Sequence, residues 1–234
     1  MEVIQVVNRA NQRGGRMLSV IDLVERETLP LSVAAGLVAR VLAGSGFLVG
    51  ASPGGAGKTA VMGALLTMLP PDSSIYLTSG SRWRDADAGE YVVAYEISPA
   101  FYEAYIWGAD LRHRCALADR GCRLISNLHA DTLEEARDQI VRQNGASAEQ
   151  FRGFEVFVPI ALARGGTFGG VTRRIDHYYA VQEEAWIRID ADGTSSPRWI
   201  TAFLESCLSD GTRRIEEVRT RWLRTLREQE RTGS

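Results

Sequence analysis

The chain has 234 residues, 45% of them hydrophobic, which is enough for one large or two small domains with a real core. Its formal net charge of −2 does not point to a nucleic-acid-binding protein. No apolar run approaches the roughly 20 residues of a membrane helix, and residues 1–17 lack the long apolar stretch of a signal peptide. We therefore expect a soluble, cytoplasmic protein without a transmembrane segment and without direct contact to nucleic acid.

Two helices and a strand are predicted in the first part of the chain. Residues 19–28 and 32–43 each begin with a serine that can cap a helix, apolar residues recur at helical spacing, and Pro30 separates the two segments. The run GFLVGA at 46–51 then predicts a short buried strand. After a glycine-rich loop, a helix is expected over 59–69, where a pair of prolines stops it.

Strands and helices alternate in the middle of the chain. We expect strands at 73–79, 91–97 and 122–128, and helices at 99–119 and 132–143. The last of these helices begins with Thr-Leu-Glu-Glu, a capping box. This alternation predicts an α/β fold with a mostly parallel central sheet and helices on both faces.

The pattern changes to consecutive strands after residue 150. The segments 154–163 and 171–193 predict strands, and the Gly165-Gly166 and Asp192-Gly193 turns favour antiparallel pairing. An arginine-rich helical tail follows, which either faces solvent or another subunit, or contacts an acidic partner or membrane headgroups. The whole chain is interpreted as a single domain with four parts: a helical lead-in at 1–45, a nucleotide-binding core at 46–145, a β extension at 150–193 and a helical tail at 197–231.

The glycine-rich segment from Ser52 to Thr59 reads SPGGAGKT and matches the phosphate-binding pattern G-x-x-x-x-G-K-[ST], except for serine at the first position. Its glycines let successive N–H groups turn inward around a β-phosphate, and the following helix directs its positive dipole end to the same point. Lys58 would bridge the β- and γ-phosphates, and the Thr59 hydroxyl would bind Mg²⁺. The predicted nucleotide contacts are Ser52, Pro53, Gly54, Gly55, Ala56, Gly57, Lys58, Thr59 and Ala60.

Lys58 is the only lysine among the 27 basic residues of the chain. A compact ammonium can sit inside a loop that wraps a phosphate, whereas a broad, planar guanidinium cannot. The single lysine therefore indicates a position at which arginine will not serve, and it supports ATP binding at this loop. The alternative interpretation is a glycine-rich turn, or a relic loop that holds sulfate or phosphate.

Three separated segments carry a family resemblance. They are TLPLSVAAGLVARVLAGSGFLVGASPGGAGKT, YVVAYEIS and LISNLHADTLEEARDQI. In order and chemistry they resemble the P-loop approach, the Walker B segment and the His-box segment of the traffic ATPases of type II and type IV secretion, type IV pili and archaeal flagella. The resemblance extends over roughly residues 20–190. It implies a RecA-like P-loop NTPase, in which antiparallel strands follow the His box.

The resemblance also implies roles for individual residues. Glu96 falls on the Walker B glutamate, which polarises the attacking water near Mg²⁺, and His129 falls on the His-box histidine near the γ-phosphate. The predicted catalytic residues are thus Glu96, Lys58 and His129, and the predicted metal ligands are Thr59 and Glu96. Family membership further implies a hexamer, partners in a secretion or pilus apparatus, and a place at the inner face of the membrane.

Structural interpretations remain open for most of these residues. Glu96 could be a surface or paired carboxylate, and His129 could be a strand-end histidine bonded to a backbone carbonyl. His113 and His177 match no motif and are expected to be structural. The three cysteines are too few and too scattered for a disulfide framework or a zinc site, so we expect them to pack in the core.

The sequence departs from the family pattern in three places. Tyr95 and Ser98 stand where Walker B has glycine and arginine, and no acidic box in register follows the strand at 73–79, although Asp85, Asp87 and Glu90 lie nearby. The family's N-terminal domain, which supplies arginines in trans, is expected to be missing. An arginine finger can contribute about 10³–10⁵-fold to turnover, so we expect slow hydrolysis. The candidates to replace it, otherwise expected at the surface, are Arg82, Arg84, Arg112 and Arg114.

Three functions are therefore compatible with the sequence. The favoured one is an ATPase that uses Mg²⁺ and ATP to drive assembly or transport. The second is a nucleotide-binding regulatory or scaffold protein with little or no hydrolysis. The third, a small-molecule kinase, is disfavoured by the His box, by the antiparallel strands and by the lack of a recognisable arginine-rich lid.

Overall fold

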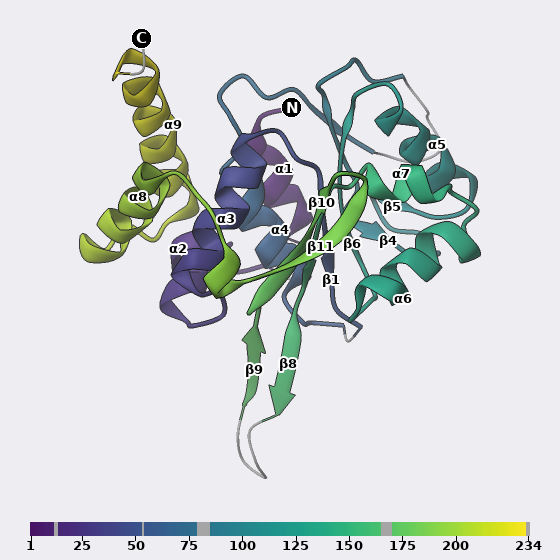
Figure 1. Ribbon diagram of the computed structural model, residues 1–234, viewed down its shortest axis with the longest axis horizontal. Coiled ribbons are helices and arrows are strands. Elements are labelled where there is room, and N and C mark those ends of the chain that lie inside the picture. Colours follow the sequence, from purple (N-terminus) through teal and green to yellow (C-terminus); the bar gives the residue numbers. More distant parts are fainter. Residues whose placement is uncertain (12–13, 53, 79–84, 165–169, 233–234) are drawn as a thin grey trace.

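The computed structural model describes residues 1–11, 14–52, 54–78, 85–164 and 170–232. Its centre is a twisted sheet with helices on both faces (Figure 1). The strand order is β11-β10-β7-β1-β6-β3-β2, and the run from β7 to β2 is parallel. Strand β10 joins β7 in the antiparallel sense, and β11 pairs with β10 in the same way. The expected α/β class, with a mostly parallel sheet, an antiparallel extension and a helical tail, is confirmed.

The strands of the structure fall into three groups. The parallel strands are β1 (Phe47–Gly50), β2 (Ile75–Leu77), β3 (Tyr91–Val93), β6 (Arg123–Leu128) and β7 (Val156–Pro159). The short β4 (Glu96–Ile97) pairs with β6, and β5 (Tyr105–Ile106) pairs with β4. The antiparallel strands β10 (His177–Gln182) and β11 (Ala185–Asp190) complete this sheet. A separate hairpin consists of β8 (Ala161–Arg164) and β9 (Val171–Arg174), and it extends away from the body of the molecule (Figure 1).

Helices cover the two faces of the sheet in two groups, each with its own buried core (Figure 1). One group comprises α1 (Val3–Ala10), α2 (Val20–Glu25), α3 (Leu31–Leu42), α4 (Lys58–Leu66), α8 (Arg198–Ser209) and α9 (Ile215–Thr232). The other comprises α5 (Ala109–Ala118), α6 (Leu133–Arg137) and α7 (Ala148–Arg152). A π-helical turn, Asp138–Gln143, extends α6, and a short 3-10 turn, Ala191–Gly193, precedes α8.

Local capping explains where several helices begin. Ser19 and Asp22 form a capping box at α2, and Thr132 and Glu135 form the predicted one at α6. The expected serine cap of the next helix is wrong, because α3 begins after Pro30 and Ser32 lies inside the helix. Proline is well suited to this boundary, since its fixed φ fits the chain as it enters a helix.

Several predicted elements differ from the structure, and the strand expected at 91–97 is divided into β3 and β4. The helix predicted over 99–119 exists only as α5, because the segment before it forms β5 beside β4 and then turns at Gly108, whose φ is 59°. The tight turn of the β10–β11 hairpin is Glu183-Glu184, both with positive φ, rather than Asp192-Gly193, which lies beyond β11. Gly165-Gly166 lies outside the described residues, although β8 and β9 on either side of it pair antiparallel as expected.

Helix α1 was missed by the sequence analysis. Its buried face consists of Val3, Val6, Val7 and Ala10, a spacing of three and four residues typical of an amphipathic helix. All three cysteines are buried, as expected for core residues. Within the described ranges, no helix is both long and apolar enough to cross a membrane.

Candidate functional site

The glycine-rich loop lies at the carboxyl end of β1 and leads directly into α4, as the motif requires. Gly57 precedes the first helical residue with φ 102°, and Gly55 also has a positive φ of 84°. Side chains rarely adopt such values, so glycine is needed at both positions. Pro53, one of the predicted contacts, lies outside the described residues.

Two residues that follow β6 hold the first residue of the loop. The backbone N–H of Ser52 donates to Asp131 Oδ1 at 2.7 Å, and His129 Nδ1 donates to the Ser52 carbonyl oxygen at 2.7 Å. Because a carbonyl oxygen only accepts, this contact places the ring proton of His129 on Nδ1. The N–H and the carbonyl of Ser52 are therefore both bound by side chains of the His-box segment. The contact of His129 is the bond to a backbone carbonyl that the structural interpretation of this histidine expects.

Lys58, Glu96 and His129 come together beside the loop, although they are far apart in the sequence. The Lys58 ammonium, 7% exposed, donates to the Ala51 carbonyl oxygen at 3.1 Å and forms an ion pair with Glu96 Oε1 at 3.5 Å. His129 Nε2 lies 3.9 Å from the same carboxylate oxygen. Parallel strands bring this about, because β1, β4 and β6 all end at the same edge of the sheet.

Burial dominates the electrostatics of Glu96. Loss of water contact raises the pKa of its carboxyl, while the charges of Lys58 and His129 act in the opposite direction without cancelling that effect. The Oε1 atom is buried, and among the described residues no donor forms a hydrogen bond with it. A buried carboxylate oxygen of this kind can accept a bond from a water molecule or coordinate a cation.

A cavity of about 420 Å³ surrounds this cluster. Its walls come from the loop, from Tyr95 and Tyr105, and from the segment between α1 and α2. Arg16 belongs to that segment, but both of its terminal nitrogens donate to Asp22, at 2.8 and 2.7 Å. The guanidinium beside it contributes to a lowered pKa for the Asp22 carboxyl, although burial acts in the opposite direction. The lead-in helices thus close one side of the phosphate loop.

Tyr95 has a structural role at the position where the family pattern has glycine. Its hydroxyl donates to the Val6 carbonyl oxygen at 2.9 Å, and its own carbonyl accepts from Asn127 Nδ2 at 2.8 Å. Burial raises the pKa of this phenol above its usual range. The tyrosine therefore ties α1 to the strand edge from which Glu96 extends.

Of the four arginines proposed as replacements, the two that the structure describes have partners away from the loop. Arg114 is buried rather than at the surface, and it donates to the Tyr76 hydroxyl at 2.9 Å. Arg112 is exposed and donates to the Asn144 carbonyl oxygen at 2.9 Å. Arg82 and Arg84 lie outside the described residues. Within the described ranges, an arginine that contacts the loop is Arg173 of β9, which donates to the carbonyl oxygens of Gly55 and Ala56.

The residues expected to hold Mg²⁺ offer a partial ligand set. The Thr59 hydroxyl belongs to the first turn of α4, and Glu96 supplies the buried carboxylate oxygen described above. Hydroxyl and carboxylate oxygens suit Mg²⁺, which usually keeps several waters and binds substrate phosphates in addition to one or two protein groups. Within the described residues, no cluster of three or more His, Cys, Asp or Glu side chains could hold a metal by itself. The donors fit a Mg²⁺ ion that arrives with a phosphate ligand.

The site is that of a mixed α/β protein with a glycine-rich loop between its central strand and a helix, an arrangement consistent with the expected RecA-like P-loop fold. No protein-family model matches the chain, and no curated protein matches it. Among solved structures it is similar to the VirB11 ATPase from the Brucella suis type IV secretion system in complex with sulphate, with 17% identity and a TM-score of 0.39.

That match covers 62% of this chain and 50% of the VirB11 ATPase chain, so the chain spans about half the length of the protein that it resembles. A likeness this distant carries no argument about activity, ligands or partners. Conclusions about function therefore depend on the geometry of the site.

Sequence reasoning missed two residues that contact the loop. Asp131 stands just beyond the carboxyl end of β6, and its place after a predicted strand could have indicated it. Arg173 had no comparable signal, because its partners are 117 and 118 residues away in the sequence.

Proposed function

We propose that this protein binds ATP with Mg²⁺ at the loop from Ser52 to Ala60 and hydrolyses it to drive assembly or transport, as a relative of secretion and pilus motor ATPases. One observation carries the proposal. The only lysine of the chain is buried at the start of α4, 3.5 Å from the buried carboxylate of Glu96 in β4. Burying such a pair is costly, so its place at a phosphate-binding loop supports a functional role.

The chemistry follows from the position of each group. The phosphates would meet the N–H groups of the loop and the Lys58 ammonium, and the Thr59 hydroxyl would bind the metal that accompanies them. When bound, Mg²⁺ would neutralise charge on the phosphates. Phosphate binding would draw Lys58 toward the ligand and leave Glu96 to orient a water, a task that suits a carboxylate with a raised pKa.

Steady-state turnover of Mg²⁺-ATP tests the proposal. Wild-type protein should release phosphate, and Lys58→Ala should not exceed the background rate. Measuring the rate over a range of protein concentrations tests the expected homo-oligomer, because activity that requires assembly rises more than linearly with concentration. Absence of both ATP binding and turnover in the wild-type protein would contradict the proposed function.

A second variant separates binding from chemistry. Glu96→Gln keeps the size and shape of the side chain but replaces one acceptor oxygen with an NH2 donor and removes its basicity, so ATP should still bind while turnover falls by about 10²-fold or more. Isothermal titration beside a phosphate-release assay measures both quantities. Equal turnover in the two proteins would remove Glu96 from the mechanism.

A nucleotide-binding regulatory or scaffold protein is the second candidate. It is favoured by the state of the arginines around the loop: Arg16 is bound to Asp22, and Arg173 is bound to backbone carbonyls. Within the described part of the chain, neither guanidinium is thus placed to stabilise charge on a transferring phosphate. Tight, Lys58-dependent binding without turnover would select this function.

The remaining expectations belong to the same proposal. A hexamer, partners in a secretion or pilus apparatus, and a cytoplasmic site at the inner face of the membrane all follow from the resemblance of the three sequence segments. Sedimentation of the protein with and without Mg²⁺-ATP measures the oligomer directly. A monomer under both conditions would favour the regulatory function.

A further inference from the structure

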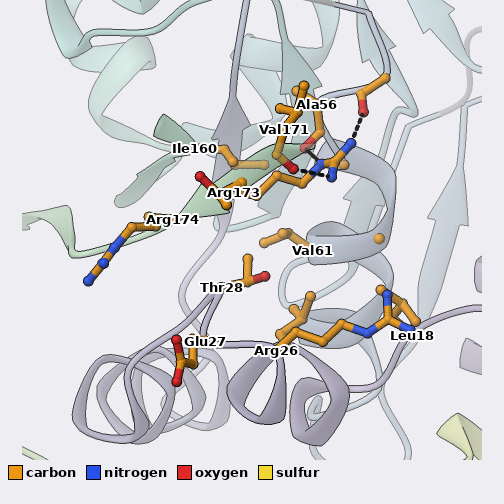
Figure 2. Close-up of a pocket in the computed structure, with 15 residues that line it drawn as sticks. Leu18, Arg26, Glu27, Thr28, Ala56, Val61, Ile160, Val171, Arg173 and Arg174 are labelled. Atoms are coloured by element: carbon orange, nitrogen blue, oxygen red, sulfur yellow. Dashed lines mark hydrogen bonds between the residues drawn. The ribbon is translucent and has the colours of Figure 1, made fainter. Parts of the chain in front are cut away.

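One arginine holds the outer side of the phosphate loop. Arg173 extends from the β8–β9 hairpin, and its Nε and Nη2 donate to the carbonyl oxygens of Ala56 at 2.9 Å and Gly55 at 3.1 Å (Figure 2). Its Nη1 also reaches the carbonyl oxygen of Val171 at 3.4 Å, on its own strand. The guanidinium therefore binds two consecutive loop carbonyls and its own hairpin at the same time.

These two bonds fix the direction of two backbone N–H groups. In a planar trans peptide, the carbonyl of one residue and the N–H of the next point in opposite directions. Because the Gly55 and Ala56 carbonyls point at Arg173, the N–H groups of Ala56 and Gly57 must point away from it. Among the described residues, neither N–H has a hydrogen-bond partner. Both belong to the loop that lines the 420 Å³ cavity.

Arginine suits this task because of its shape. Its planar fork presents parallel donors to two acceptors, while an ammonium is a compact charge without that fork. No carboxylate of the described residues forms an ion pair with Arg173, whereas the adjacent Arg174 pairs with Asp176 at 3.0 Å and points away from the loop (Figure 2). The guanidinium of Arg173 is thus bound to the loop carbonyls, on the side of the loop opposite to the N–H groups that would face phosphates.

We propose that Arg173 is a positioning residue for phosphate binding. It holds the Gly55 and Ala56 peptide planes so that successive N–H groups converge on the phosphates of the nucleotide, and it links the β8–β9 hairpin to an occupied loop. This inference rests on the proposed function. It concerns the phosphates alone, so it applies equally to a nucleotide and to inorganic tripolyphosphate.

Calorimetric titration with ATP and with tripolyphosphate tests the inference, using Arg173→Ala and the matched control Arg174→Ala. Loss of two charge-assisted hydrogen bonds, whose partners can then bind water, should weaken both ligands about tenfold in Arg173→Ala. Arg174→Ala should bind both ligands as the wild type does, and all three proteins should unfold at the same temperature.

Chemical rescue distinguishes positioning from a general structural effect. Free guanidinium ion, well below the concentrations that unfold proteins, should restore part of the affinity in Arg173→Ala and have no such effect on the control. Arg173→Lys should recover little, because it lacks the fork. Unchanged affinity in Arg173→Ala, an equal loss in Arg174→Ala, or a loss accompanied by a lower unfolding temperature would each overturn the inference. Wild-type protein that binds neither ligand would overturn the proposed function as well.

Discussion

The two ends of α4 are built in opposite ways. At the start, the N–H groups of Ala56 and Gly57 have no partner among the described residues, and the backbone turns through a positive φ at Gly57. At the far end, Arg219 donates to the carbonyl oxygens of Thr67 and two neighbouring residues, and Trp222 Nε1 donates to that of Met68 at 2.8 Å. One end is completed by α9, and the other is left open to a ligand.

The helix dipole gives this difference an electrostatic meaning. The start of a helix attracts anions and its end attracts cations. Arg219 already provides the cation at the end of α4, and burial lowers the pKa of its guanidinium to about 10, so it stays charged at neutral pH. At the start, the first turn of α4 contains no acidic residue, and no side chain caps the helix. This arrangement favours a phosphate ligand at the start of α4, while contacts with α9 stabilise its far end without a ligand.

The largest expected effect concerns the closed end. Trp222 is fully buried, stacks on Trp199 with ring centroids 5.4 Å apart and packs against Phe203. Trp222→Ala should lower the free energy of unfolding by about 3–5 kcal/mol, because it leaves a large cavity and an unpaired carbonyl. Urea unfolding measures this change, and Arg224→Ala, exposed on the same helix, is the control. A loss below about 1 kcal/mol would mean that α9 does not hold the core.

At the open end, Lys58→Ala should weaken ATP binding by about a hundredfold or more, since it removes charge-assisted contacts worth roughly 1.5–3 kcal/mol each. Lys58→Arg should fail as well, because the site is 7% exposed and the guanidinium is too broad for it. Isothermal titration measures both affinities, with unfolding curves to show that the variants are folded. Unchanged affinity for ATP in either variant would show that the start of α4 does not need the Lys58 ammonium to bind the ligand.

The open end was more predictable than the closed end, and the reason is the range of the interactions. The loop, β1 and α4 are adjacent in the sequence, so glycine positions and one lysine were sufficient to predict them. The convergence of Glu96 and His129 on the same edge followed from strand ends in a parallel sheet. Contacts such as Arg219 with Thr67, or Arg173 with Ala56, join residues more than a hundred positions apart. They depend on packing between elements, which leaves no local pattern.

A substitution of Arg219 tests whether the two ends of α4 act independently, and its expected effect is smaller. Arg219→Met keeps most of the apolar stem but removes the donors to the backbone carbonyls just after α4, so the free energy of unfolding should fall by about 2 kcal/mol. ATP affinity should not change, because the loop lies at the other end of the helix. Unfolding curves and titration on the same variant measure both quantities. Weakened ATP binding in the folded variant would show that the ends of α4 are coupled.

The smallest expected effect concerns the pH dependence that Glu96 gives to stability. Burial raises the pKa of its carboxyl in the folded protein, so the folded state binds this proton more tightly than the unfolded state does. The bound proton therefore stabilises the folded state. This contribution to the free energy of unfolding is fully present below the unfolded-state pKa and is lost as the pH rises through the higher, folded-state pKa. Glu96→Gln is uncharged throughout this range and lacks the contribution.

Relative to the wild type, Glu96→Gln should therefore gain free energy of unfolding as the pH is raised from about 5 to about 8. Urea unfolding of both proteins at the two pH values measures the change, and Glu228→Gln, an exposed glutamate on α9, is the matched control. If the difference between Glu96→Gln and the wild type were the same at both pH values, the attraction of Lys58 and His129 would offset the cost of burying the carboxylate. The buried charges at the start of α4 would then not lower the free energy of unfolding. Stability would no longer distinguish this end from the far end of α4.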